Sequence, residues 1–103
     1  MKHSDKRQKQ RRIDKAIKAA IQAIEAGEYE ALSFEDHYRT CGHAFVSARE
    51  VQFKIFIDVD HFDYFDFIKG PGFSLNHDES EKYDEVIADL DKWEYLLEAE
   101  VKG

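Results

Sequence analysis

Residues 51–60 read VQFKIFIDVD, the clearest secondary-structure pattern in this chain of 103 residues. Apolar side chains occupy its odd-numbered positions, whereas polar side chains and one phenylalanine occupy the even-numbered ones. A period of two is typical of a half-buried β-strand with one face toward the core. The side chains predicted to face inward are Val51, Phe53, Ile55, Ile57 and Val59. Those predicted to face outward include Phe56, Asp58 and Asp60.

Two shorter strands are expected beside this one. Residues 43–47 form the first, joined to the central strand by a turn at Ala48-Arg49-Glu50. Residues 62–68 form the other, and the triplet Gly70-Pro71-Gly72 then forces a turn. The inward face of this last strand stays open, because two apolar sets compete for the core: Phe62, Tyr64 and Ile68 against Phe65 and Phe67. An antiparallel three-stranded meander is the simplest arrangement.

Helices are expected on both sides of the strands in the sequence. The first carries an apolar stripe at three- and four-residue spacing and ends at Gly27; its members are Ile13, Ile17, Ala20, Ile21 and Ile24. The last carries a similar stripe, made of Tyr83, Val86, Leu90, Trp93 and Leu97, with Asn76 or Ser80 as its cap. Residues 28–42 predict a short helix or turn. The predicted fold is therefore α+β, a two-layer sandwich in which N- and C-terminal helices pack on a three-stranded antiparallel sheet, in the order α-(short α)-β-β-β-α.

The length fits a single domain spanning residues 1–103. Charge is unevenly distributed along it. Residues 1–20 hold eight basic and two acidic side chains, although the whole chain has a net charge of −7. Residues 1–12 are expected to form a basic N-terminal arm that can be mobile. The acidic remainder repels nucleic acid and favours cationic protein surfaces, which argues against direct nucleic-acid binding.

Residues 56–67 combine carboxylates with aromatic side chains. Aspartate is a poor strand former, and neighbouring carboxylates repel one another, so this acidity costs folding free energy. A binding face would explain it, because aromatic rings supply contact area and carboxylates match Lys and Arg of a partner. The alternative is a solvated face whose charges prevent edge-to-edge aggregation. The predicted partner-binding residues are Phe56, Asp58, Asp60, Asp63, Tyr64 and Asp66.

The sequence predicts no catalytic residues, no metal site and no cofactor. It contains no nucleophile elbow and no Gly-rich phosphate loop, and its aspartates lack the glycine and distal glutamate of a calcium loop. His37, Cys41, His43 and His61 lack the paired spacing of a zinc site. Cys41 is the only cysteine, so no intramolecular disulfide can form, and we expect a cytoplasmic protein. No secretory signal or membrane-spanning segment is expected.

Three functions remain open at this stage. The first is a small acidic, non-enzymatic inhibitor that occludes a basic nuclease or nucleic-acid-binding enzyme by charge mimicry. In size and charge the chain resembles anti-restriction and anti-CRISPR proteins of phages and immunity proteins against nuclease toxins. The second is a homodimeric structural or regulatory module that pairs through its aromatic sheet face. The third is a nucleic-acid binder that uses the basic N-terminal arm.

Overall fold

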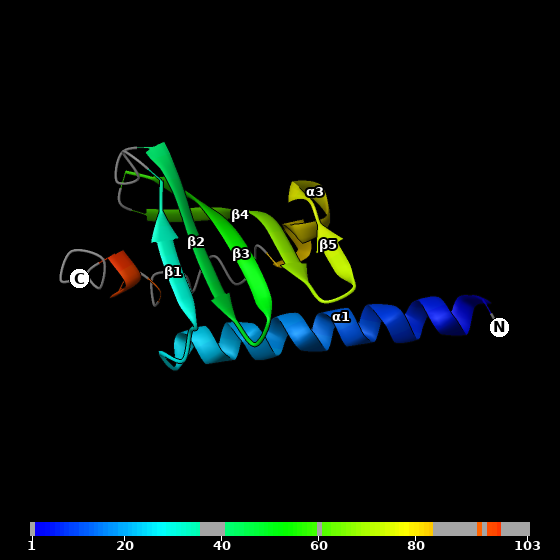
Figure 1. Ribbon diagram of the computed structural model, residues 1–103. Coiled ribbons are helices and arrows are strands. Elements are labelled where there is room, and N and C mark those ends of the chain that lie inside the picture. The colour runs from blue at the N-terminus through cyan, green and yellow to red at the C-terminus, as the bar shows by residue number, and fades with distance from the viewer. Residues whose placement is uncertain (1, 36–40, 60, 84–92, 94, 98–103) are drawn as a thin grey trace.

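The computed structural model describes residues 2–35, 41–59, 61–83, 93 and 95–97, and for residues 2–6 the backbone alone. In this part of the chain, five antiparallel strands form one sheet in their sequence order, β1 to β5. The long helix α1, Lys2–Glu25, lies along one face of the sheet (Figure 1). The strands are β1 (Ala31–Phe34), β2 (Gly42–Ala48), β3 (Val51–Asp58), β4 (His61–Gly70) and β5 (Phe73–Leu75), followed by the short helix α3 (His77–Ser80).

The predicted three-stranded sheet flanked by N- and C-terminal helices is wrong, because each edge of the sheet carries one more strand. The three predicted strands correspond to β2, β3 and β4. Strand β1 replaces the short helix or turn expected over residues 28–42, and it pairs with β2 through Leu32 opposite Val46 and Phe34 opposite Ala44. Strand β5 has only three residues. Segments this short show no usable periodicity, so their strand character depends on the neighbour they pair with.

Only parts of the predicted C-terminal helix fall within the described residues. They are α3, a single 3₁₀ turn over residues 81–83, and a short helical segment over residues 95–97. Asn76 caps α3 as expected: its side chain accepts a hydrogen bond from the Glu79 backbone, and the Glu79 carboxylate accepts one from the Asn76 backbone. Val86, Ile87 and Leu90 lie outside the described residues.

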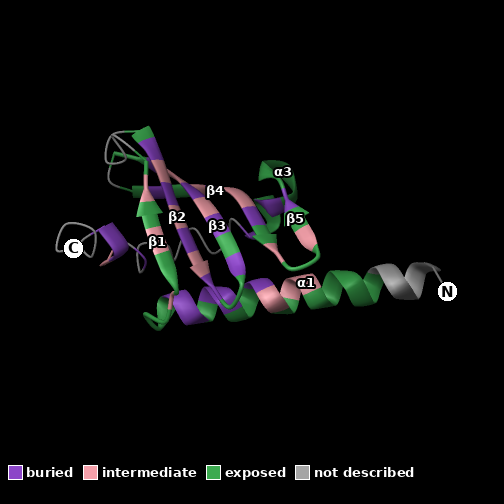
Figure 2. Ribbon diagram, viewed as in Figure 1, coloured by how far each residue is buried: buried purple, intermediate pink, exposed green. Residues whose placement is uncertain are grey.

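The core lies between α1 and the facing side of the sheet (Figure 2). Helix α1 contributes the apolar stripe predicted from the sequence, with Ile17, Ala20 and Ile24 fully buried. Strand β3 contributes its odd-numbered side chains through Ile57, as predicted. Val59 is the exception: it lies in the turn after β3 at a positive φ of 49° and is 66% exposed. Trp93, Leu96 and Leu97 complete the core.

Two β-bulges decide which side chains of β4 enter the core. The pairing of β4 with β3 shifts register twice, and Asp63 and Asp66 are the extra residues at the two shifts. Because each bulge adds one residue, Phe62, Phe65 and Ile68 all face the core at a spacing of three. Tyr64 and Phe67 face the other way, opposite Phe56 and Lys54 of β3. The core-facing residues of β4 therefore repeat every three positions, a period that neither a regular strand nor an α-helix has. Each of the two competing apolar sets contributes to the core.

Two tyrosine hydroxyls tie α1 to residues that follow the sheet. Tyr83 donates a 2.8 Å hydrogen bond to the Asp14 carboxylate, and Tyr95 donates a 2.5 Å hydrogen bond to the backbone carbonyl of Ile24. The helix itself begins at Lys2, so the basic arm predicted over residues 1–12 is helical from that residue onward. Within the described part of the chain, no helix is both long and apolar enough to cross a membrane.

Candidate protein-binding face

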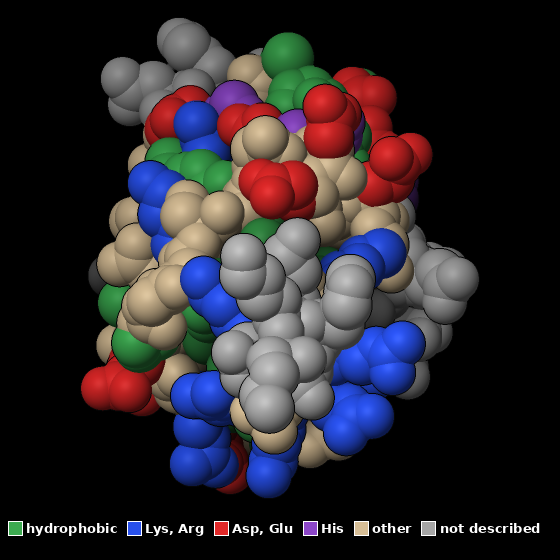
Figure 3. Space-filling view, turned by 90° about the vertical axis from the view of Figure 1, so that its right-hand side faces the viewer, with side chains coloured by type: hydrophobic (Ala, Val, Ile, Leu, Met, Phe, Trp, Pro, Cys, Tyr) green, Lys and Arg blue, Asp and Glu red, His purple; other side chains and the backbone are tan. Residues whose placement is uncertain are grey.

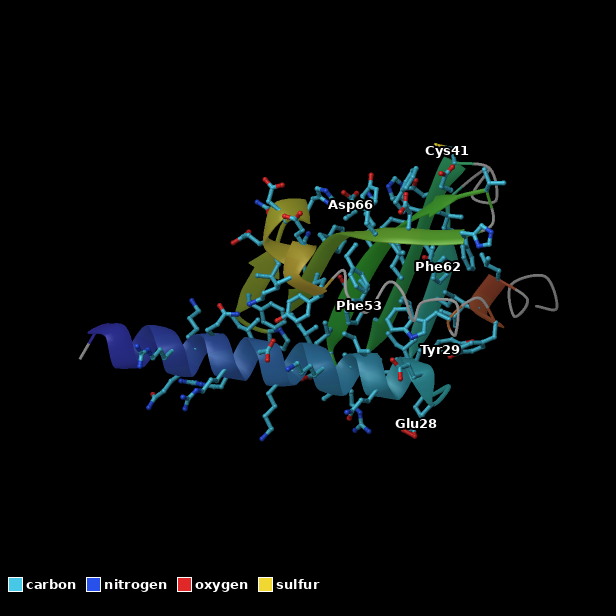
Figure 4. All side chains as sticks on the ribbon, turned by 180° about the vertical axis from the view of Figure 1, so that it is seen from behind. Glu28, Tyr29, Cys41, Phe53, Phe62 and Asp66 are labelled. Carbon is cyan, nitrogen blue, oxygen red and sulfur yellow. The ribbon has the colours of Figure 1, made fainter. Side chains whose placement is uncertain are left out.

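The face of the sheet that points away from α1 carries the residues predicted to bind a partner; we call it the open face. Figure 4 shows the two sides from behind: Phe53 points toward α1, whereas Asp66 lies on the opposite side of the sheet. The even-numbered side chains of β3 and the odd-numbered side chains of β2 reach this face, and most of them are half-buried. It is therefore a packed surface of side chains and not a fully solvated one.

Four rings cross the open face in a line that we call the aromatic row. It begins at His43 of β2, whose ring centroid lies 5.6 Å from that of Phe56 on β3. Phe56 stacks on Tyr64 of β4 at 5.1 Å, and Tyr64 lies 4.7 Å from His77 of α3. The row follows the strand pairing, because His43 is directly opposite Phe56 and Phe56 is directly opposite Tyr64. Only Phe56 and Tyr64 are near parallel, at 24°, whereas the two histidine rings are tilted against them.

The predicted aspartates separate into two kinds. Asp58 and Asp63 are exposed beside the β3–β4 connection, and neither makes an ion pair within the described residues. Asp66 is half-buried and belongs to an internal charge network. Asp60 lies outside the described residues. The two predicted aromatic anchors, Phe56 and Tyr64, are in direct contact, so the structure brings together Phe56, Tyr64, Asp58 and Asp63 at one end of the open face.

The network around Asp66 compensates charge locally. Its Oδ2 atom lies 3.4 Å from Nζ of Lys54 and 3.5 Å from Nε2 of His43. The Nδ1 atom of His43 lies 2.9 Å from a carboxylate oxygen of Glu35. The Lys54 ammonium lies beside the Asp66 carboxylate, and the His43 ring bridges Asp66 and Glu35. Asp66 therefore serves the sheet itself, and its charge is not free for a partner.

The far end of the open face carries two lysines. Lys54 lies over the Phe45 ring at 5.5 Å, and Lys69 lies over the Phe67 ring at 4.5 Å. Such cation–π contacts hold the ammonium groups against the face. The acidic surface predicted from the sequence is thus confined to the end that holds Asp58 and Asp63. We call this end the acidic tip and define it by Phe56, Asp58, Asp63 and Tyr64.

The sequence prediction missed the histidines of the aromatic row. His43 could have been placed from the two-residue turn at Arg49-Glu50, because that turn fixes the register of β2 on β3 and puts His43 opposite Phe56. His77 could not, since its contact with Tyr64 depends on where α3 lies, and its Nδ1 atom is 3.2 Å from the Phe65 carbonyl. Nothing local to residues 73–80 predicts that position.

The open face presents aromatic contact area and charged side chains. Among the described residues, no three side chains of His, Cys, Asp or Glu gather closely enough to hold a metal ion. The exposed Cys41 pairs through its backbone with Asp58, next to the acidic tip. Comparison of the chain with protein-family models, with curated proteins and with solved structures gave no match in any of the three.

Proposed function

We propose that this protein is a small non-enzymatic inhibitor that binds a basic surface of a nuclease or other nucleic-acid-handling enzyme. The supporting observation is the acidic tip, where two exposed carboxylates flank the stacked rings of Phe56 and Tyr64. Aromatic rings at the centre of an interface supply buried contact area, and surrounding carboxylates pair with the Lys and Arg that such enzymes present to phosphates. The proposal places the protein in a reducing cytoplasm, where the exposed Cys41 stays a free thiol.

The distribution of charge over the molecule favours this orientation. Viewed from the N-terminal end of α1, acidic side chains gather on the side of the sheet and α3, whereas Lys and Arg gather around the helix (Figure 3). Asp78, Glu79 and Glu81 are exposed in and just after α3, next to the aromatic row. A cationic surface would be steered toward the acidic side and away from the helix.

A homodimer formed through the same aromatic face is the competing proposal. Self-association of a chain with a net charge of −7 has to depend on apolar burial. Within the described residues, Val59 is the only large apolar side chain that is exposed. The half-buried rings of the aromatic row are already in contact with one another, which leaves less apolar surface for a second copy.

The test compares two double variants that remove the same charge. Asp58→Asn with Asp63→Asn changes the acidic tip, and Glu25→Gln with Glu30→Gln changes exposed carboxylates at the end of α1 and beside β1. The wild-type protein is used to capture its partner from nuclease-treated lysate of the source, and the captured protein is purified. Calorimetry should show at least about tenfold weaker binding for the tip variant and a change below about threefold for the control.

Three outcomes would contradict the proposal. The captured protein could fail to bind nucleic acid, or bind it without competition from this chain. The two double variants could weaken binding equally. Sedimentation could show a salt-insensitive dimer of this chain with no other partner, which would favour the homodimer. The single variant Asp66→Asn adds a further check, since its charge is compensated by Lys54 and it should weaken partner binding by less than about threefold.

A further inference from the structure

A cleft of about 560 Å³ lies between α1 and two turns at the end of the sheet opposite to the β3–β4 connection. The first turn is Arg49-Glu50, between β2 and β3, and the second is Pro71-Gly72, between β4 and β5. Helix α1 supplies Lys9, Arg12, Ile13 and Ala16 to the wall. None of these residues belongs to the open face, so the cleft is a separate feature on the other side of the molecule.

Three cations line this cleft against a single carboxylate, that of Glu50. Lys9 and Arg12 make no ion pair within the described part of the chain. Arg49 has one at 3.7 Å with Glu28, and both side chains are about 60% exposed, so the pair is weak and open to exchange. Among the side chains that the structure describes, cations therefore outnumber carboxylates in the cleft, although the whole chain is acidic.

The backbone at the turn supports a role for the arginine side chain. Arg49 and Glu50 have positive φ values of 51° and 66°, a conformation that Asn and Gly adopt at less cost. The turn itself would be more stable with those residues. An arginine at this position therefore comes at a conformational cost. It lines the same cleft as Lys9 and Arg12, and its guanidinium also lies within 3.7 Å of Glu28.

The floor of the cleft is apolar and contains one aromatic ring. Ile13, Ala16 and Phe73 are half-buried there, and Phe73 also borders a neighbouring hollow that shares Lys9, Ile13 and Gly72 with the cleft. Gly70 allows the ring its position, because a Cβ atom at residue 70 would come within 2.4 Å of the Phe73 ring. Proteins that bind single-stranded nucleic acid combine two elements. Cations contact the phosphate backbone, and an aromatic ring stacks against a base.

Helix α1 adds positive charge beyond the cleft. Arg7 and Arg11 are exposed on α1 and do not line the cleft, and they lie next to Lys9 and Arg12, which do. The first turns of α1 extend beyond the sheet (Figure 1). Like charges at this spacing destabilise a helix, and cations near its N-terminus oppose its dipole. A polyanion lying along the helix would relieve both effects. Evenly spaced phosphates fit this distribution better than a single acidic patch of a folded protein does.

We propose that the cleft between α1 and the two turns binds single-stranded nucleic acid, with Lys9, Arg12 and Arg49 on phosphates and Phe73 against a base. The acidic body gave reason to expect no direct binding. The structure separates the charges in space, however: the acidic tip lies at the β3–β4 connection, whereas the turns that line the basic cleft lie at the other end of these strands. The two sites are independent, and failure of one proposal leaves the other standing.

Fluorescence anisotropy with a labelled dT12 oligonucleotide at about 50 mM salt tests the proposal. Arg12→Gln with Arg49→Gln removes two cations of the cleft. The control Lys69→Gln with Lys82→Gln removes two exposed cations that neither line the cleft nor belong to α1. The cleft variant should bind at least about tenfold more weakly, and the control less than about threefold more weakly. The slope of log affinity against log salt should fall by about 1.4 for the cleft variant, or about 0.7 for each lost phosphate contact.

Several results would overturn the proposal. One is the absence of dT12 binding to the wild-type chain at low salt, and another is an equal loss in the two variants. Competition by poly-glutamate as effective as that by unlabelled dT12 would show a general anion site. A 12-base-pair duplex that binds as tightly as dT12 would show that bases do not enter the cleft. Thermal unfolding of each variant confirms that the chain is folded in every assay.

Discussion

Asp14 and Tyr83 lie 69 positions apart, yet the tyrosine hydroxyl donates a hydrogen bond to the carboxylate. This bond lowers the pKa of Asp14, and Lys18, 3.1 Å away, adds to the effect. Burial, and then the same bond, raise the pKa of Tyr83. At neutral pH the hydrogen bond therefore favours an ionised Asp14 and a protonated Tyr83. It also holds α1 against the segment after α3.

Replacing Tyr83 with Phe should lower the free energy of unfolding at pH 7 by about 1 kcal/mol, because the carboxylate of Asp14 loses a donor but stays partly exposed to water. The pKa of Asp14 is lowered from 3.8, so its contribution is present above that pH and is lost as the pH falls through the lower folded value. The difference between wild type and variant should shrink below about pH 3.8. Urea unfolding across pH 2.5–7 measures it.

Tyr95→Phe is the matched control for this pH dependence. It also removes one hydroxyl that donates to α1, but the acceptor is the uncharged carbonyl of Ile24. Its cost should stay constant over the same pH range, since no titrating acceptor is involved. A cost that shrinks equally with acid in both variants would show that the Asp14–Tyr83 pair is not the source of the effect.

At the scale of the element, β4 shows how bulges let one strand serve two surfaces. Phe65 is fully buried and its ring lies 5.5 Å from that of Phe53 and 6.1 Å from that of Trp93. Phe67, two positions later, faces the open side and contacts Phe45. In a regular strand the two phenylalanines would share one face. The bulge at Asp66 separates them.

Phe65→Ala should therefore lower the free energy of unfolding by about 3–5 kcal/mol, because it leaves a cavity against Phe53 and Trp93. Phe67→Ala should lower it by about 1 kcal/mol or less, since its ring is only partly removed from water. Chemical denaturation of the two variants measures both values. Similar losses would contradict the two-bulge register of β4.

At the scale of the whole molecule, the sheet and the second half of α1 form the packed body, and the first turns of α1 extend beyond it. A helix of 24 residues is about 36 Å long. Described side chains become half-buried only from Ile13 onward, and the first fully buried one is Ile17. The first three turns of α1 therefore owe little of their stability to the core.

Deleting residues 2–8 should shift the melting temperature by no more than about 3 °C, because the described side chains of α1 are half-buried only from Ile13 onward. Ile17→Ala should lower the free energy of unfolding by about 2–4 kcal/mol, since Ile17 is fully buried between α1 and the sheet. Circular dichroism melts compare the two. A loss from the deletion as large as that from Ile17→Ala would mean that the first turns of α1 pack against the body.

The sequence by itself determined the elements whose periodicity is long and regular. The alternation over residues 51–57 placed β3 and its inward face, and the stripe from Ile13 to Ile24 placed the buried side of α1. The turn predicted at Ala48-Arg49-Glu50 followed from the strands it joins, and the turn predicted at Gly70-Pro71-Gly72 followed from its residue types. The outward position of Phe56 followed from the same alternation, whereas the side of the sheet that Tyr64 occupies did not. Periodic features of this kind depend on contacts between residues close in sequence, so they can be predicted from the sequence alone.

Only the tertiary structure decided the rest. Strands β1 and β5 are too short to show a period, and they exist because β2 and β4 offer unpaired backbone groups at their edges. The bulges at Asp63 and Asp66 interrupt regular pairing and allow three apolar side chains to be buried. That burial depends on the space beneath β4. The same packing paired Asp66 with Lys54 and so removed it from the predicted site. It also placed His77 against Tyr64 and assembled the basic cleft from residues far apart in sequence.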